Sequence, residues 1–305
     1  MRILMANILR KTFFLDTNIL HFATPIYHYT SPEGLEGILT SNSLHFTNIY
    51  FLNDKSEMIY THKLLKKILP DLQNEINPEL LQEINKRADY VTCSNYYNEE
   101  SEVLFREDFY IASFSTDSDN LALWNNYTKN DNKIGYNIAF DVLKLIEFVK
   151  FFDKEKIFEG SLVCYDPDKQ KKLLTEQIRE ANIYYTKENK QGILKELFEN
   201  FITDSLFFKH PSFAIENEFR IIWSNLSHIG DKNLNFKIRG GLYVPYKQLP
   251  LPKRGIFKKP DDVINEIGVS PTAPKELLQY SLKKLLNKTN HHFLKIRYSD
   301  IPLRF

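Results

Sequence analysis

The sequence has few cysteines, and neither lies in a pattern that binds metal. Of 305 residues only Cys93 and Cys164 are cysteine, without a CxxC motif or a Cys/His cluster. Two cysteines in a chain of this length exclude a disulfide-rich scaffold, and the missing patterns give no support to a zinc ribbon or zinc finger. We therefore expect a protein of the reducing cytoplasm without a cysteine-based zinc site.

Long apolar runs and an excess of one charge are also lacking. No stretch approaches the roughly 18 apolar residues that span a bilayer. The first 20 residues include Arg10, Lys11 and Asp16 and lack the cleavage site of a signal peptide. The 40 Lys and Arg residues balance 39 Asp and Glu residues, so no overall charge draws the chain to nucleic acid or membrane. A local basic groove is still compatible with this balance.

Several familiar catalytic motifs are absent. GxxxxGK[ST], GxGxxG, HExxH and GxSxG do not occur, which removes the sequence support for a P-loop, a dinucleotide fingerprint, a zincin helix and a hydrolase nucleophile elbow. Asp-x-Lys pairs such as Asp131-Asn132-Lys133 do occur. A chain this rich in lysine contains such pairs by chance, so they support a nuclease only weakly.

The chain is rich in apolar and aromatic residues instead, at 43% and 14%, which is sufficient for a large core. Strand-like and helix-like segments follow one another without regular βα alternation, so we expect an α+β fold and not a doubly wound sheet. We expect an N-terminal extension at 1–24 and one domain at 25–305. Polar helical insertions are expected at about 72–102 and 168–206, the second broken near Gly192.

The most informative segment is the predicted strand at 216–223, with the sequence Glu-Asn-Glu-Phe-Arg-Ile-Ile-Trp. Side chains alternate across a strand, so Glu216, Glu218 and Arg220 are predicted to share one face, opposite Phe219. Two carboxylates on one face repel each other unless water, a cation or a ligand accommodates them. On spacing alone, a solvated face on which Arg220 offsets the carboxylates is the simpler interpretation.

Other candidate residues lie earlier in the chain. His28 belongs to a short aromatic strand that precedes a helix, which Ser31 and Pro32 begin. Ser113 and Ser115 share one face of a predicted strand. Trp124 and Tyr127 are neighbours on a predicted helix. Each group also has an ordinary interpretation: a histidine bonded to backbone, a strand end, and a pair of core aromatics.

In this order the segments resemble a bacterial family known as domain of unknown function 2971 (DUF2971). Four motifs carry the resemblance: His-Tyr-Thr and a Gly-Leu-x-x-Ile-Leu helix at 28–39, Leu-Asn-Asp at 52–54, Ser-Phe-Ser with a Trp-x-x-Tyr helix and a Phe-Asp strand at 113–141, and Glu-x-Glu-aromatic-Arg at 216–220. They fall within a resemblance that spans roughly residues 25 to 270. It departs from the family where Gly268 and Pro271 are separated.

The pattern is also similar to that of the ADP-ribosyltransferases. This similarity implies a split β-sheet core with helical insertions, NAD as substrate and no requirement for a metal. It implies transfer of ADP-ribose to a protein or nucleic acid, or NAD hydrolysis, in a toxin or phage-defence factor. By analogy Glu218 would bind the nicotinamide-ribose hydroxyl and stabilise charge at the reacting carbon, Glu216 would orient or deprotonate the acceptor, and His28 would hold the ribose or the nicotinamide amide. The implied NAD-binding residues are His28, Tyr29, Thr30, Ser113, Ser115, Trp124, Tyr127 and Arg220.

Two alternatives stay open. One is a non-catalytic module on the same fold that binds a nucleotide or a partner. The weaker one is a metal-dependent nuclease. The hypotheses differ in geometry, because the transferase requires His28, Ser115 and Glu218 to converge on one cleft, whereas the nuclease requires acidic residues gathered around a cation.

Overall fold

A computed structural model describes residues 25–52, 57–88, 108–127, 134–152, 157–186, 189–225, 234–252 and 263–303. The expected extension at 1–24, the Asn53-Asp54 turn, the Asp131-Asn132-Lys133 run and the end of the first helical insertion lie outside these ranges.

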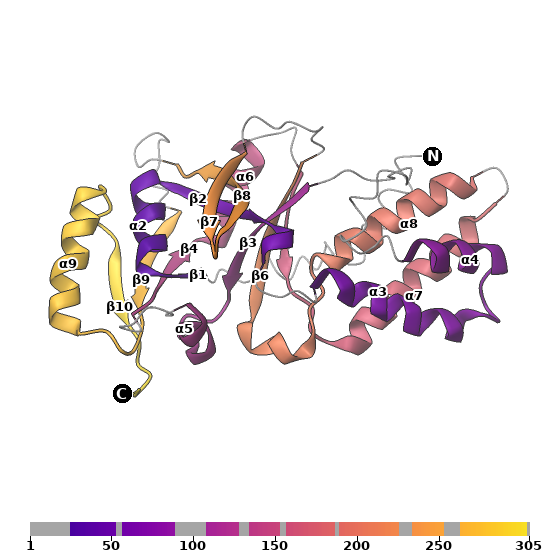
Figure 1. Ribbon diagram of the computed structural model, residues 1–305, viewed down its shortest axis with the longest axis horizontal. Helices are drawn as coiled ribbons and strands as arrows, with labels where there is room; N and C mark the ends of the chain where they lie inside the picture. The colour runs from indigo at the N-terminus through magenta and orange to yellow at the C-terminus, as the bar shows by residue number, and fades with distance from the viewer. Residues whose placement is uncertain are drawn as a thin grey trace.

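The described strands form one mixed but mostly antiparallel sheet, which makes the fold α+β (Figure 1). Along the main path the order is β10-β9-β4-β1-β3-β2-β8-β7, and β6 lies between β3 and β5. Only β9 and β10 pair in parallel among these strands. The strands are β1 (Ile26–Thr30), β2 (Ser43–Asn48), β3 (Asp108–Ser115), β4 (Tyr136–Phe140), β5 (Ile157–Leu162), β6 (Glu218–Asn225), β7 (Asn235–Arg239), β8 (Leu242–Pro250), β9 (Ile264–Val269) and β10 (Lys295–Tyr298).

Strand β3 is the branch point of the sheet. One edge pairs with β6 over eight consecutive residue pairs, from Asp108↔Asn225 to Ser115↔Glu218. A strand has two edges, so β1 and β2 share the other one. There β2 pairs at 110–111 and β1 pairs at Ser115 alone. Strands β1 and β2 therefore diverge beside residues 112–114 of β3.

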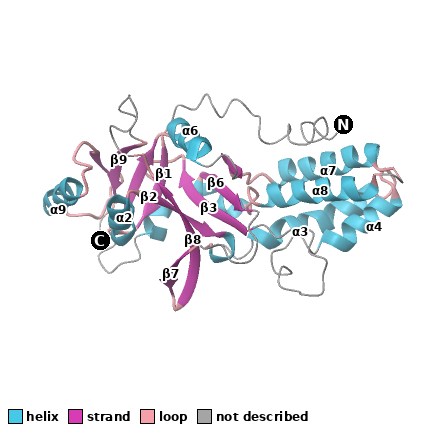
Figure 2. Cartoon of the chain, turned by 90° about the horizontal axis from the view of Figure 1, so that it is seen from above, coloured by secondary structure: helices cyan, strands magenta, loops and turns pink. Residues whose placement is uncertain are grey.

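Helices cover the sheet and also extend from one end of it. The α-helices are α2 (Pro32–Ser41), α3 (Glu57–Ile68), α4 (Pro78–Arg87), α5 (Leu121–Tyr127), α6 (Val142–Phe152), α7 (Pro167–Tyr184), α8 (Lys190–Ser205) and α9 (Lys275–Lys288). Short 3₁₀ helices are η2 (Ile49–Phe51), η3 (Leu69–Leu72) and η6 (Pro211–Glu216). Helices α3, α4, α7 and α8 gather beside the sheet in both ribbon views (Figure 2).

Helix α2 follows its local sequence signals. The Ser31 hydroxyl accepts a hydrogen bond from the Gly34 amide at 3.2 Å, and Pro32 occupies the first turn. Asn42 ends the helix in the left-handed region at φ 46°. The i, i+3, i+4 spacing of Leu35, Ile38 and Leu39 places all three in the sheet core. Helix α2 therefore begins directly after the end of β1, close to His28.

The bundle of α3, α4, α7 and α8 has its own apolar core, separate from the core under the sheet. It connects to the sheet near β5, where Cys164 forms an isolated bridge with Phe208. The buried Gln170 of α7 donates hydrogen bonds to the carbonyl oxygens of Cys164 and Lys209, at 2.6 and 3.1 Å. The bundle thus fixes the chain just before β6.

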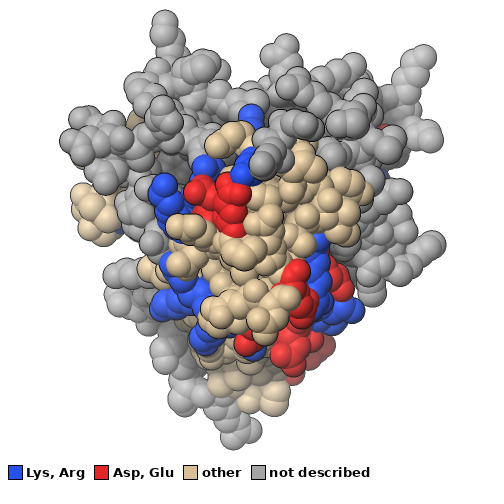
Figure 3. Space-filling view, turned by 90° about the vertical axis from the view of Figure 1, so that its right-hand side faces the viewer, with Lys and Arg blue, Asp and Glu red and all other residues tan. Residues whose placement is uncertain are grey.

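The end of the molecule formed by the bundle carries both signs of charge over its described surface (Figure 3). Ion pairs cross between elements there: Arg179 of α7 with Glu75, and Lys190 of α8 with Glu79 of α4. Exposed pairs of this kind contribute little stability. Their mixture of signs gives this face no uniform field for nucleic acid.

Gly240 and Gly241 form the tight turn between β7 and β8, because both have positive φ, which suits a two-residue hairpin loop. Two sequence expectations are corrected by the fold. In the second helical insertion α7 ends at Tyr184 and α8 begins at Lys190, so Gly192 lies inside α8 and is not the break. Glu216 is not part of a strand. It ends η6, and Asn217 at φ 44° separates it from β6.

Candidate functional site

The candidate site is built on the paired strands β3 and β6. Ser113 lies opposite Arg220 and Ser115 opposite Glu218. Directly paired residues of antiparallel strands project to the same face, so these four polar side chains form one patch. Phe219 projects to the other face and is buried in the sheet core. The expected alternation along this strand is confirmed from Glu218 onward.

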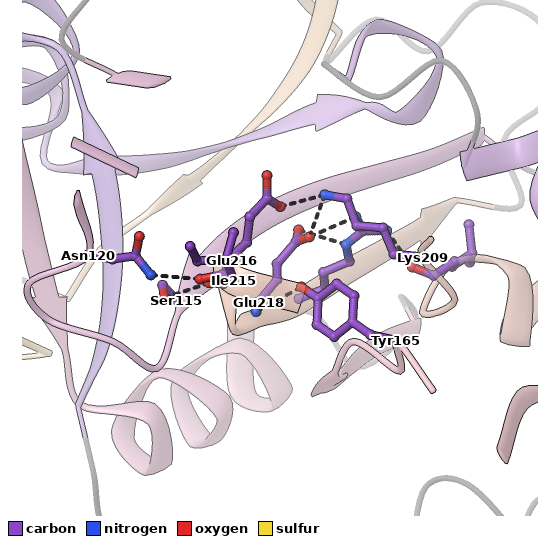
Figure 4. A network of polar contacts seen from close by, with 9 residues as sticks. Ser115, Asn120, Tyr165, Lys209, Ile215, Glu216 and Glu218 are labelled. Atoms are coloured by element: carbon purple, nitrogen blue, oxygen red, sulfur yellow. Dashed lines mark hydrogen bonds and ion pairs between the residues drawn. The ribbon is translucent and has the colours of Figure 1, made fainter. Parts of the chain in front are cut away.

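Glu218 lies at the centre of a buried ionic network (Figure 4). Its Oε1 accepts a hydrogen bond from Arg220 Nε at 2.7 Å, and its Oε2 accepts one from the same guanidinium at 2.9 Å. Lys209 Nζ donates to Oε2 at 3.1 Å and to Glu216 Oε2 at 2.7 Å. Glu218 and Arg220 are only 5% and 1% exposed. The simpler sequence interpretation, a solvated strand face, is therefore wrong.

The surroundings of Glu218 favour its charged form. Burial by itself raises the pKa of a carboxyl, but the Arg220 charge and hydrogen bonds outweigh it, and Lys209 and a hydrogen bond from Ser113 add to the effect. The pKa of Glu218 is therefore held below its ordinary value. The backbone amide of Glu218 donates to the Tyr165 hydroxyl at 3.1 Å, and burial raises the pKa of that phenol.

Glu216 reaches the network from outside the strand. The Asn120 side chain donates to the Ile215 carbonyl at 2.6 Å, and Ser115 Oγ donates to the Glu216 carbonyl at 2.7 Å. These bonds hold η6 against the start of α5 and direct the Glu216 carboxylate to Lys209. The Ser115 hydroxyl also accepts from the Asp117 amide at 3.0 Å. Ser115 therefore positions Glu216 while it contributes to the cavity wall.

His28 lies where β1 and β2 diverge. Its Nδ1 is 2.9 Å from the Ser113 carbonyl oxygen, and because a carbonyl only accepts, Nδ1 carries the proton. Burial lowers the pKa of His28, and the nearby Lys237 charge lowers it further. The neutral ring therefore keeps Nε2 as an acceptor near neutral pH.

Two adjoining cavities open over this patch. The Glu218 cavity, of about 340 Å³, is lined by Tyr29, Ser113, Ser115, Tyr127, Glu216, Glu218 and Arg220 among others. The His28 cavity, of about 570 Å³, is lined among others by His28, Tyr29, Thr30, Ser113 and Tyr127. They share Tyr29, Leu52, Ser113, Asn126 and Tyr127. Together they are of a size that suits a small-molecule ligand.

Trp124 is the sequence candidate that lines neither cavity. Its ring packs edge-on against Tyr29 at 4.7 Å between centroids, and its Nε1 donates to Asp119 at 2.8 Å. Trp124 is 2% exposed. Trp124 therefore packs behind Tyr29, which lines both cavities, and does not itself border either of them.

Several cavity residues had no recognisable signal in the sequence. Lys209 follows α8 and Lys237 lies in β7, and each is one of many lysines in the chain. His45 lies in β2 and Arg239 ends β7. Only the pairing of distant segments brings these side chains to the two cavities.

The described part of the chain offers no group of three or more His, Cys, Asp or Glu side chains arranged to hold a metal ion. The nuclease hypothesis therefore gains no support from it. Within the same ranges, every helix is too short or too polar to cross a membrane.

Comparison with known proteins gives one match. The family model described as protein of unknown function (DUF2971) matches residues 123–221, from α5 into β6. This supports the resemblance to that family over the segment that carries Glu216, Glu218 and Arg220. No curated protein and no solved structure matches the chain.

Proposed function

We propose that the chain is an ADP-ribosyltransferase-like enzyme that cleaves the nicotinamide-ribose bond of NAD and transfers ADP-ribose to a protein or nucleic acid. One observation carries the proposal. Of ten candidate residues, seven line the Glu218 cavity, and His28 and Thr30 join them through the adjoining His28 cavity. These nine residues come from separate segments, and a shared ligand explains why they converge.

The sheet supports the same assignment. The transferase analogy implies a split β-sheet core, and β1 and β2 diverge beside β3 where His28 contacts Ser113. His28, Ser115 and Glu218 lie on the neighbouring strands β1, β3 and β6. The transferase hypothesis, a fold-level analogy, requires these three residues to converge on one cleft. It is supported by the wall that the Glu218 cavity shares with the His28 cavity.

The proposed reaction breaks the bond between C1′ of the ribose and the nicotinamide nitrogen. The electron pair of that bond leaves with nicotinamide, which departs neutral, so no general acid is required. Positive charge develops on the ribose as in glycoside cleavage. The carboxylate of Glu218, kept ionised by Arg220, stabilises this charge more in the transition state than in the ground state.

An acceptor oxygen or nitrogen then bonds to C1′ and loses a proton. Glu216 is placed to receive it, since its carboxylate is more exposed than that of Glu218 and lies on the same cavity wall. Water in place of the acceptor gives NAD hydrolysis by the same steps. His28 and Tyr29 hold the substrate from the opposite strand, through Nε2 and the phenol ring.

Glu218 must exchange one hydrogen bond to hold a ribose hydroxyl. A carboxylate has about four acceptor sites, and Arg220, Lys209 and Ser113 occupy them. Lys209 is the partner that can give up its hydrogen bond to Glu218, because it already donates to Glu216 at the shorter distance. We expect substrate to shift Lys209 toward Glu216.

A specific observation also favours the non-catalytic alternative. Glu218 is nearly inaccessible and fully hydrogen-bonded, as in a purely structural ion pair. On that hypothesis the cavities bind a nucleotide or a partner without turnover.

The test is release of nicotinamide from NAD by the wild type and by Glu218→Gln, with cell lysate as a source of acceptor. Glu266→Gln is a matched control, since Glu266 pairs with Arg297 at 2.7 Å on the outer strands β9 and β10. We expect activity in the wild type and in the control, and its loss in Glu218→Gln.

The double variant Glu218→Gln/Arg220→Gln separates chemistry from folding. It removes both charges of the buried pair, so its stability should recover relative to the single variant. Activity that stays absent as stability recovers supports a catalytic Glu218. Activity that returns with stability contradicts it, and a wild type that releases no nicotinamide with any acceptor supports the binding module.

A further inference from the structure

The two cavities differ in how their charges are matched. In the Glu218 cavity the cations are paired with the two carboxylates, as described above. In the His28 cavity Lys237 and Arg239 reach in from β7, and neither forms an ion pair with a carboxylate of the described residues. Among the described residues, Glu33 is the one acidic residue in its wall, and it is exposed at the start of α2, where solvent screens its charge.

Neutral oxygens hold both cations in place. The Lys237 ammonium lies 5.7 Å from the centre of the Tyr246 ring and donates to Thr47 Oγ1 at 3.1 Å. An ammonium group has three donors, so this contact leaves donors for a ligand. The Arg239 guanidinium donates to the Phe51 carbonyl, which uses one of its five donors and leaves the planar fork that suits phosphate oxygens.

The positive charge of these two cations lowers the pKa values of neighbouring groups. Burial lowers the pKa of Lys237, and the Arg239 charge lowers it further. Burial also lowers the pKa of His45 to about 4, and after burial the Lys237 charge is the next cause. Burial also lowers the pKa of His28, where the hydrogen bond to the Ser113 carbonyl acts in the opposite direction and the Lys237 charge lowers the pKa further. Both imidazoles therefore favour the neutral form at pH 7, where they can serve as hydrogen-bonding groups beside two cations that form no ion pair with a carboxylate of the described residues.

We propose that the His28 cavity is the subsite for the diphosphate group of a nucleotide, with Lys237 and Arg239 as its cationic ligands. The inference rests on the proposed function and deepens it, because it sets the direction in which NAD lies. In this direction the anionic diphosphate lies beside Lys237 and Arg239, and the ribose that gains positive charge lies beside Glu216 and Glu218. The reverse direction would bring the diphosphate against those carboxylates.

The shared wall makes this direction feasible for one ligand. Tyr29, Ser113 and Tyr127 belong to both cavities, so a molecule that enters one borders the other. Lys237 and Arg239 lie on the same face of β7 because they are two residues apart. Phe236 and Ile238 project to the opposite face and are 57% and 73% exposed.

The experiment is isothermal titration of the full chain with ADP, adenosine and inorganic pyrophosphate. The variants are Lys237→Gln, Arg239→Gln and the charge-keeping Lys237→Arg. Lys284→Gln is the matched control, because this lysine also contacts an aromatic ring, Tyr280 at 5.5 Å, but on the distant helix α9. Circular dichroism before each titration confirms that the variants are folded.

We expect ADP to bind at least tenfold more tightly than adenosine, and more weakly as salt rises. Lys237→Gln and Arg239→Gln should each weaken ADP binding about tenfold or more, the usual size of a charge-assisted hydrogen bond. Lys237→Arg and Lys284→Gln should bind like the wild type.

Equal binding of ADP and adenosine, or unchanged binding by Lys237→Gln and Arg239→Gln, overturns the diphosphate subsite. If pyrophosphate binds as tightly as ADP, the proposal that the bound diphosphate belongs to a nucleotide is overturned. Failure here is distinguishable from failure of the proposed function. Nicotinamide release with an unchanged KM in both variants would refute the subsite alone, whereas ADP binding that depends on Lys237, without any nicotinamide release, would refute the catalytic proposal alone.

Discussion

Replacing Glu218 with glutamine should destabilise the fold strongly, whatever the activity of the protein. The substitution removes the negative charge but nearly preserves the volume, so packing changes little. Arg220 is 1% exposed and also donates a hydrogen bond to the Leu206 carbonyl, at 2.8 Å. The variant therefore removes from a buried guanidinium the carboxylate that accepts two of its hydrogen bonds.

The expected loss of stability follows from the broken ion pair. Removing one partner of a buried ion pair costs about 3–5 kcal/mol. Lys209 keeps Glu216 at 2.7 Å, and the glutamine oxygen still accepts one hydrogen bond, so we expect the lower end, about 3 kcal/mol. Glu266→Gln breaks a pair whose side chains are each 26% exposed and should cost about 0–1 kcal/mol.

Urea denaturation followed by circular dichroism measures both losses, provided that each variant unfolds in one transition. Glu218→Gln should have a clearly lower midpoint than Glu266→Gln at an unchanged slope. A loss below about 1 kcal/mol, the upper end expected for an exposed pair, would refute the reasoning. It would mean that solvent reaches Arg220 and that the network is looser than its distances indicate.

The remaining predictions concern acid, the cavity potential and two glycines. Because the folded-state pKa of Glu218 lies below the unfolded value of 4.5, its stabilisation is present above pH 4.5 and is lost as pH falls through the folded pKa; urea midpoints should therefore fall less steeply with acid in Glu218→Gln than in the wild type. Lys237→Gln should raise the pKa of His45 above about 4, as measured by NMR titration. An unchanged pKa would mean that the Lys237 charge does not act on His45. Gly37→Ala should stabilise α2 by about 0.5–1 kcal/mol, since an added Cβ meets nothing there. Gly268→Ala should cost about 1–3 kcal/mol, because its Cβ would collide with the Asn137 side chain; equal thermal midpoints for the two alanine variants would contradict this assignment.

Local sequence patterns were sufficient for most of the secondary structure. His28 lies on the short strand β1, and helix α2 follows it with Ser31 as its cap and Pro32 in its first turn, as expected. These features depend on residues within a few positions of one another, such as a hydroxyl three residues before an amide. Helix α6 was not predicted. Its sequence is a short apolar run, and such a run does not distinguish helix from strand.

The candidate residues themselves were recognisable because their motifs are contiguous. Glu218, Arg220, Ser113 and Ser115 occur in two short strands whose alternation predicts which side chains share a face. The alternation failed at Glu216, where a left-handed Asn217 interrupts the strand. A single residue with positive φ changes the chain direction, and asparagine adopts that conformation without a distinctive neighbouring pattern.

By itself, then, the sequence determined the elements and the polar residues that they carry. The tertiary structure decided which of those residues meet. Lys209 reaches Glu218 because the helical bundle fixes the chain before β6, and Lys237 and Arg239 join His28 because β7 folds back on β8 beside β2. The burial of Glu218 likewise depends on the tertiary structure. The physical reason is that local propensity acts over a few residues, whereas burial, charge pairing and cavity shape depend on contacts between segments far apart in the chain.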